Sequence, residues 1–314
     1  MPRTAESISS TSLWSSVHDI GIRLSYVGSR SRGLNYSLNI NKPRPSLIPF
    51  SPDRNPYPQF VSTAFFRSDG SANYNAMSFE VTRKFARDVT FSGHWDWSSN
   101  MANYLNLENP YTSLLWNRDQ YTPHHRVSVN ATWNLPFGHG KRYGSSAPKL
   151  LDEAFGGWTL YYLAYFQTGS WFTPQYDGAD PSNTNTVGGL PDRIRDGNLP
   201  TSQRNINRWF DPSAFAPPPA GRFGNSGVNI LEGPGLQVHH LTISKRFSIT
   251  ERLKLQTMLA ASDVLNHSNF HFPHANISAP GQAGVIDTTY GGGDDFNLEK
   301  AANRRMEVRL RLEF

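Results

Sequence analysis

Three histidines near the end of the chain have the spacing of metal ligands. His267, His271 and His274 lie four and three residues apart, and two His–His pairs occur at 124–125 and 239–240. A zinc site needs imidazoles that converge on one point and outer partners that orient them. Loop histidines beside Asn and Phe more often serve as polar caps. The sequence therefore predicts no metal site and no cofactor.

Aspartates in two long polar segments offer calcium chemistry. Asp177, Asp180, Asp192 and Asp196 lie in one segment, and the pair Asp294–Asp295 lies in the next. None of them fits a D-x-[DN]-x-[DN]-G loop. We expect these carboxylates to form Asx turns instead.

Catalytic motifs are missing from the sequence. Ser170 and Ser226 have no nucleophile-elbow context, and the glycine clusters at 233–235 and 291–293 precede no Lys-Ser pair or helix pattern. The chain has no cysteine, which excludes thiol nucleophiles, thiolate metal sites and disulfides. We expect no catalytic residues and no enzymatic activity.

Four loop aromatics are the candidate ligand contacts. Trp171, Phe172, Trp209 and Phe210 lie in the longest segment without a strand pattern, where they could stack on a sugar or a peptide. A loop of this length also needs a small core of its own, and we favour that packing role. Four other tryptophans, at 95, 97, 133 and 158, lie near strand ends, as an interfacial girdle requires.

The composition favours strands and loops. The 314 residues include 8 Trp, 13 Tyr, 19 Phe, 25 Gly and 22 Pro, and only 18% are charged. Disordered chains are poor in aromatics, and Gly and Pro interrupt every long helical window. The net charge of +5 comes from scattered Arg without a basic block, so nucleic acid is not an expected partner.

A strict two-residue alternation ends the chain. One side carries Met306, Val308, Leu310, Leu312 and Phe314, and the other carries Arg305, Glu307, Arg309, Arg311 and Glu313. On a soluble edge strand, five outward apolar side chains are a liability. A strand between lipid and a watery lumen needs this pattern. We therefore predict that the apolar set faces the membrane.

The same alternation predicts nine strands and an all-β fold. They cover residues 19–26, 34–40, 77–82, 89–97, 127–135, 157–167, 238–247, 253–261 and 303–314. Short connections (28–33, 84–88, 136–156 and 248–251) alternate with long ones (41–73, 98–125, 168–237 and 263–302). This is the layout of a transmembrane antiparallel β-barrel, with short periplasmic turns and long extracellular loops. We expect an outer-membrane protein with an irregular start at 1–16 and a long extracellular loop at 168–236.

An odd strand count has a further consequence. If the last strand ends in the periplasm, the first of nine begins outside, whereas complete single-chain barrels have an even number of strands. The N-terminus shows no signal peptide. We expect residues 1–314 to be one partial barrel domain, the C-terminal part of a larger barrel without its plug. A small closed barrel with a tenth strand at 61–67 is the alternative.

Several long motifs resemble a known family. These are SYVGSRSRGLNYSLNINKP (25–43), HHRVSVNATWNLPFGHGKRYG (124–144), AFGGWTLYYLAYFQTGSWFTP (154–174), GLPDRIRDGNLP (189–200), RWFDPSAFAPPPAGRFGNSGVNILEGPG (208–235) and DVLNHSNFHFP (263–273). In this order they resemble the barrel of Oar-like TonB-dependent receptors. The chain departs from the family motif at Ser262 and Asp263.

The resemblance implies uptake of a scarce ligand through extracellular loops and lumen. It implies as partners the outer-membrane lipid and the barrel-assembly machinery, and, in the intact protein, a plug domain and the TonB complex. The alternative is a secreted, soluble all-β carbohydrate-binding module or glycosidase. A glycosidase would need two inward carboxylates ~5–10 Å apart, and the predicted strands offer no obvious pair.

The terminal aromatic gives a first test. In such receptors the assembly machinery reads it, so replacing Phe314 by Ala in the complete protein should lower the amount found in the outer membrane. Immunoblots of outer-membrane fractions measure this, and an unchanged level would remove that role from Phe314.

Overall fold

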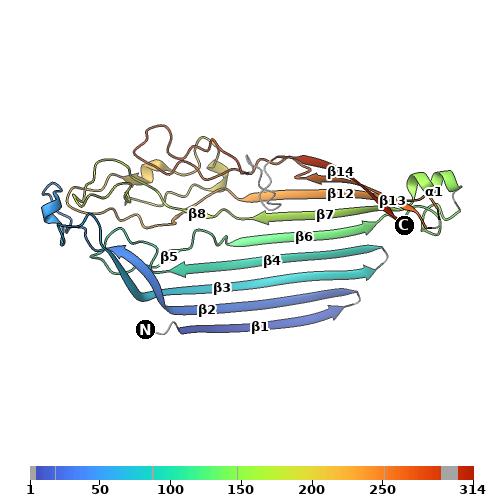
Figure 1. Cartoon of the computed structure of the whole chain (residues 1–314), viewed down its shortest axis with the longest axis horizontal. Coiled ribbons are helices and arrows are strands. Elements are labelled where there is room, and N and C mark those ends of the chain that lie inside the picture. Colours follow the sequence, from blue (N-terminus) through green and yellow to red (C-terminus); the bar gives the residue numbers. More distant parts are fainter. Residues whose placement is uncertain (1–4, 18, 87, 147, 251, 291–302) are drawn as a thin grey trace.

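The described chain folds into one long antiparallel sheet, with its main strands in sequence order (Figure 1). The computed structural model describes residues 5–17, 19–86, 88–146, 148–250, 252–290 and 303–314. The main strands are β1 (Ala5–Val17), β2 (Ile20–Asn39), β3 (Ala64–Ala86), β4 (Val89–Ala102), β6 (His125–Asn134), β7 (Trp158–Gln167), β12 (Leu236–Ser248), β13 (Lys254–Ser262) and β14 (Arg305–Glu313). β1 and β14 form the two edges, and within the described residues they do not pair with each other, so the sheet is open.

Small elements decorate the connections. β5 (Asn117–Arg118) extends the sheet beside β4, β8 (Trp171–Phe172) pairs with β11 (Leu231–Glu232), and β9 (Asp192–Arg193) pairs with β10 (Phe215–Ala216). Three 3-10 turns, η1 (Pro52–Arg54), η2 (Thr201–Gln203) and η3 (Pro212–Ala214), accompany one helix, α1 (Lys149–Phe155). Across the described residues, no helix has the length and apolar character needed to span a membrane.

The strand register separates an apolar face from a polar face. One row of paired residues runs across five strands as Leu24, Phe79, Trp95, Val127 and Phe166. The row one position along contains Arg23, Glu80, His94 and Ser128, and Arg23 forms an ion pair with Glu80 at 2.5 Å. Because side chains alternate across a strand, the predicted pattern becomes two continuous surfaces. We call them the apolar face and the polar face.

The terminal stripe continues the apolar face. Met306, Val308, Leu310 and Leu312 pair with Ala261, Leu259, Thr257 and Leu255 of β13, and all four side chains are exposed. Phe314 follows the strand and is fully exposed. Their contact with lipid stays a prediction.

Two polar side chains within the apolar face are satisfied by neighbours. His239 is buried and contacts the Tyr162 hydroxyl at 2.6 Å and the Gln237 amide at 3.0 Å. Lys245 is only 2% exposed and lies 5.0 Å from the centres of both the Trp158 and Phe247 rings. An unpaired polar group at either position would be costly in an apolar environment.

The predicted turn at 28–33 is wrong. Residues 20–39 form the single strand β2, in which Gly28 pairs with Ser9 of β1 and Asn75 of β3. Gly33 does adopt a positive φ of 72°, but it lies at a register shift between Arg32 and Leu34. The glycine therefore allows a bulge and not a reversal of the chain.

The irregular start predicted at 1–16 is also corrected, because residues 5–17 form β1. Its alternation is broken: Leu13 pairs with Leu24 of the apolar face, while the adjacent Trp14 pairs with Arg23 of the polar face. The proposed extra strand at 61–67 does not form either, since residues 64–67 begin the 23-residue strand β3.

Short and long connections alternate, as predicted, but the first short connection lies at 18–19 and not at 28–33. Residues 18–19, 87–88, 135–157 and 249–253 join strands at one end, and residues 40–63, 103–124, 168–235 and 263–304 join them at the other. Figure 1 shows α1 at the short-turn end and the larger segments gathered at the opposite end, where β1 begins.

The two faces predict different costs for one charge placed at adjacent positions of β13. Leu259 lies on the apolar face between Ile243 and Val308, whereas Met258 pairs with Ser244 and Arg309 on the polar face. Leu259→Lys should lower the free energy of unfolding in lipid vesicles by about 2–4 kcal/mol, the usual cost of Lys at the bilayer midplane.

Met258→Lys is the matched control and should cost clearly less. Urea titrations of the complete protein in vesicles, followed by heat-modifiable gel mobility, give both values. Equal losses for the two variants would contradict the assignment of the faces.

Candidate functional site

The long connections join into one folded cap. Its core consists of Phe172, Phe210, Ala214, Phe215 and Leu231, all buried and all from the 168–235 connection. Phe272, Ala275, Ile277 and Ala283 of the 263–304 connection pack against this cluster. Trp209 N donates to Gly284 O at 2.8 Å, and Ile286 N donates to Ile206 O at 2.7 Å. The longest connection is therefore the centre of the cap.

Three of the four candidate ligand aromatics lie in this packing, and Trp171 packs instead against Arg118 and His124. Phe172 and Phe210 are buried, with ring centres 5.8 Å apart, so neither presents a free face to a ligand. Trp209 is partly buried, and its indole N–H donates to Glu232 O at 2.8 Å. The Arg118 guanidinium lies over Trp171, with Cζ 4.1 Å from the centre of the Trp171 ring. The packing role that we favoured accounts for these contacts, and ligand binding by the four stays a prediction.

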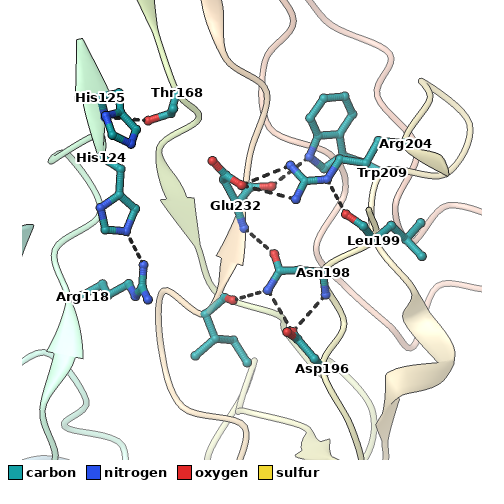
Figure 2. Close-up of polar contacts among 11 residues, drawn as sticks. Arg118, His124, His125, Thr168, Asp196, Asn198, Leu199, Arg204, Trp209 and Glu232 are labelled. Carbon is teal, nitrogen blue, oxygen red and sulfur yellow. Dashed lines mark hydrogen bonds and ion pairs between the residues drawn. The ribbon is translucent and has the colours of Figure 1, made fainter. Parts of the chain in front are cut away.

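Arg118 and His124 both pack against the Trp171 ring, with the His124 and Trp171 ring centres 5.3 Å apart. Figure 2 shows the contact between Arg118 and His124. His124 Nδ1 lies 3.2 Å from Ser98 O, and its Nε2 lies 2.5 Å from Arg118 Nη1. A carbonyl only accepts and a guanidinium only donates, so His124 is neutral with its proton on Nδ1. Burial, and then the charge of Arg118, lower the pKa of His124. The trio is a fixed contact between two connections.

Glu232 organises the other group drawn in Figure 2. Arg204 donates to the Glu232 carboxylate at 3.2 and 3.3 Å. The backbone N of Glu232 donates to Asn198 Oδ1 at 2.9 Å. Asn198 Nδ2 also reaches Ile230 O at 2.9 Å. These hydrogen bonds hold β11 in place, so the polar groups of Glu232, Arg204 and Asn198 have a structural role.

A charged node links three connections. Lys42 Nζ donates to Glu108 O at 3.0 Å and to Thr186 Oγ1 at 3.1 Å, while the Glu108 carboxylate accepts from Leu190 N at 3.0 Å. Burial raises the pKa of Glu108, against the opposing effects of the Leu190 N–H and of Lys42. Burial likewise lowers the pKa of Lys42. Each charge is costly to bury, and each is compensated by the other connections.

Asp180 forms the local turn predicted for it. Its carboxylate accepts from the backbone N–H groups of Ser182, Thr184 and Thr186 at 3.0, 2.7 and 3.1 Å. Burial alone would raise its pKa, but the hydrogen bonds outweigh burial and lower it. Its lone pairs are thus committed to the backbone. Asp196 accepts from Asn198 N at 3.1 Å in a second Asx turn.

The remaining metal candidates are dispersed. His274 contacts Asp287 at 2.8 Å, His267 contacts Asn269 at 3.3 Å, and His271 lies against Tyr290. Asp192 pairs with Arg222, whereas Asp294 and Asp295 lie outside the described residues. Within the described ranges, no group of three or more His or acidic side chains could hold a metal ion.

A polar cavity of about 560 Å³ opens beside the ends of β2 and β3. Asp69 accepts from the Tyr36 hydroxyl at 2.8 Å and pairs with Arg67. Other lining residues are Leu38, Asn103, Asn106, Leu107, Asn109 and residues 110–114. The Arg67–Asp69 ion pair and the Asn side chains provide both hydrogen-bond donors and acceptors. This combination suits a ligand rich in hydroxyl or amide groups. The sequence predicted a strand at 34–40 and long connections at 41–73 and 98–125, but no pattern connected these segments into one cavity.

Comparison with known proteins identifies the family. Residues 14–306 match the model of an outer membrane beta barrel domain, so the chain belongs to that family and its location is the outer membrane. Among solved structures, the chain is similar to the outer membrane transporter YddB from Escherichia coli at 9% identity and a TM-score of 0.49. The match covers 98% of this chain and 32% of that one, so the chain spans about a third of its length. No curated protein matches the sequence.

The Glu108 site predicts a pH dependence of the cap. Because the folded pKa is raised, the native state binds more protons than the unfolded state from the ordinary Glu pKa up to the folded one, and stability falls as pH rises through that window. Glu108→Gln keeps an oxygen for Leu190 N and cannot titrate. The protection of nearby amides from hydrogen exchange in this variant, relative to wild type, should therefore increase as the pH rises above about 4.5.

Hydrogen–deuterium exchange of residues 186–195, corrected for intrinsic exchange, measures the difference in protection between the variant and wild type. His124 titrates in both proteins, so its contribution cancels in this difference. Glu153→Gln at the opposite end of the sheet is the control and should leave these amides unchanged. A pH-independent difference for Glu108→Gln would contradict the assignment.

Proposed function

We propose that the chain is the C-terminal barrel portion of a TonB-dependent outer-membrane receptor of the Oar-like type. The open sheet supports this most directly. In a bilayer, an unpaired strand edge exposes backbone groups to hydrocarbon, and only closed barrels avoid this cost. Both β1 and β14 have one strand partner within the described residues. Closure of the barrel therefore needs further strands, which we assign to the same protein.

The connections support the receptor part of the proposal. A cap with its own apolar core presents a polar cavity at the extracellular end of the sheet, beside the polar face. We propose that a hydroxyl- or amide-rich solute binds there and passes through the lumen when the TonB complex displaces the plug. The residues act by hydrogen bonding and carry out no covalent chemistry.

The soluble alternative is not favoured. A secreted carbohydrate-binding module would not need an exposed apolar face, and the family of this chain belongs to the outer membrane. The polar face of the barrel does carry Glu80 and Asp96, but they contact Arg23 and Ser78. These partners suit a charged lumen wall.

The complete protein, as encoded in its genome, tests TonB dependence. Its reading frame should encode a plug and further strands before this chain. The purified complete protein in detergent should bind the isolated periplasmic domain of TonB in biolayer interferometry, and a general porin should not. A frame without a plug, or an absence of TonB binding by the folded protein, would overturn the receptor type while leaving the barrel intact.

A further inference from the structure

The turn between β6 and β7 exposes apolar side chains at the short-turn end of the sheet. Within residues 135–157, Phe137, Tyr143, Leu151 and Phe155 are all exposed, and the Phe137 and Tyr143 ring centres are 5.7 Å apart. The outer-membrane location makes this the periplasmic end, because barrels of this kind have short periplasmic turns.

Helix α1 exposes apolar side chains together with its charged ones. Leu151 and Phe155, one turn apart, are 50% and 65% exposed. The polar Asp152 instead points to the chain, where its carboxylate accepts a hydrogen bond from His139 N. An ordinary surface helix turns its apolar side to the core and its charges to water. Leu151 and Phe155 therefore form an exposed apolar side of α1, which is unusual for a surface helix.

Contacts fix α1 beside the apolar face of the sheet. Lys245, which lies in the apolar-face register opposite Trp158, donates from Nζ to Ala154 O at 3.1 Å and to Gly156 O at 2.8 Å. The Trp158 indole N–H also donates to Ala154 O, at 3.0 Å. The last carbonyls of the helix, which lack intrahelical partners, are thus bound by residues of β12 and β7. The helix continues the apolar face at its periplasmic margin.

Charged residues frame this apolar group. Lys149 is 90% exposed and pairs with Glu153 across one helical turn at 3.9 Å, while the Arg142 guanidinium lies 5.4 Å from the Tyr143 ring centre. Long basic side chains beside apolar anchors are typical of segments in the headgroup layer. Aromatic rings with polar edges favour the same depth.

We propose that α1, with Phe137 and Tyr143, forms an interfacial anchor in the inner leaflet of the outer membrane. Leu151 and Phe155 enter the boundary of the acyl chains, and Arg142 and Lys149 reach the phosphates. The occupant is lipid because the helix is bound to the margin of the face that we predict to contact lipid. The inference rests on the family's location and not on TonB dependence.

Single cysteine labels test the anchor, and the chain has no native cysteine to remove. Phe155→Cys and Glu153→Cys, in the complete protein with any cysteines outside this chain replaced, are labelled with the fluorophore NBD. The protein is reconstituted in vesicles of phosphatidylethanolamine and phosphatidylglycerol. Quenching is measured with a shallow nitroxide lipid and with aqueous iodide. Heat-modifiable mobility confirms that each variant is folded.

The label at 155 should be quenched several-fold more by the nitroxide lipid than the label at 153, and iodide should show the reverse order. Leu259→Cys provides the reference for a label within the acyl region. Equal, iodide-dominated quenching at both positions would overturn the proposal. Shielding of position 155 from both quenchers would also overturn it, because a protein surface would then cover the helix.

Discussion

Pairing of every backbone N–H and C=O is the constraint on which the rest of this structure depends. In hydrocarbon no water replaces a missing partner, so a membrane sheet must pair each strand on both sides. Within the described residues, each main strand from β2 to β13 has a partner strand on both sides, and the bulge at Gly33 preserves pairing where a turn would have ended it. Because pairing fixes the register, it also collects alternate side chains into an apolar face and a polar face.

The same constraint divides the molecule into two ends with different physics. At the long-connection end the chain makes a core of its own, with Phe172, Phe210 and Leu231. Charges there are compensated between connections, as Lys42 and Glu108 show. At the short-turn end, the segment with α1 leaves its apolar residues exposed. One end therefore resembles a small soluble domain, and the other resembles a membrane margin.

The sequence predicts what periodicity controls. The all-β class, the alternating connections and the outer-membrane location follow from strands such as 305–313, where every second residue is apolar. Prediction from periodicity fails where a strand is interpreted without the strands that pair with it. Residues 28–33 look like a turn until Gly28 is paired on both sides, and residues 5–17 lack alternation but form a strand beside β2. The cavity residues Tyr36, Asp69 and Asn106 come from different segments that no motif connects.

Lys245 shows how a polar residue contributes at a boundary that sequence reading treats as purely apolar. Its position in β12 places it on the apolar face, where an unsatisfied ammonium would be costly. The carbonyls at the end of α1 satisfy two of its donors, and Trp158 and Phe247 flank its charge. The lysine in turn satisfies carbonyls that a short helix leaves without partners. Each polar group thus removes the cost of the other, and the pair holds an amphipathic helix where the sheet meets the headgroups.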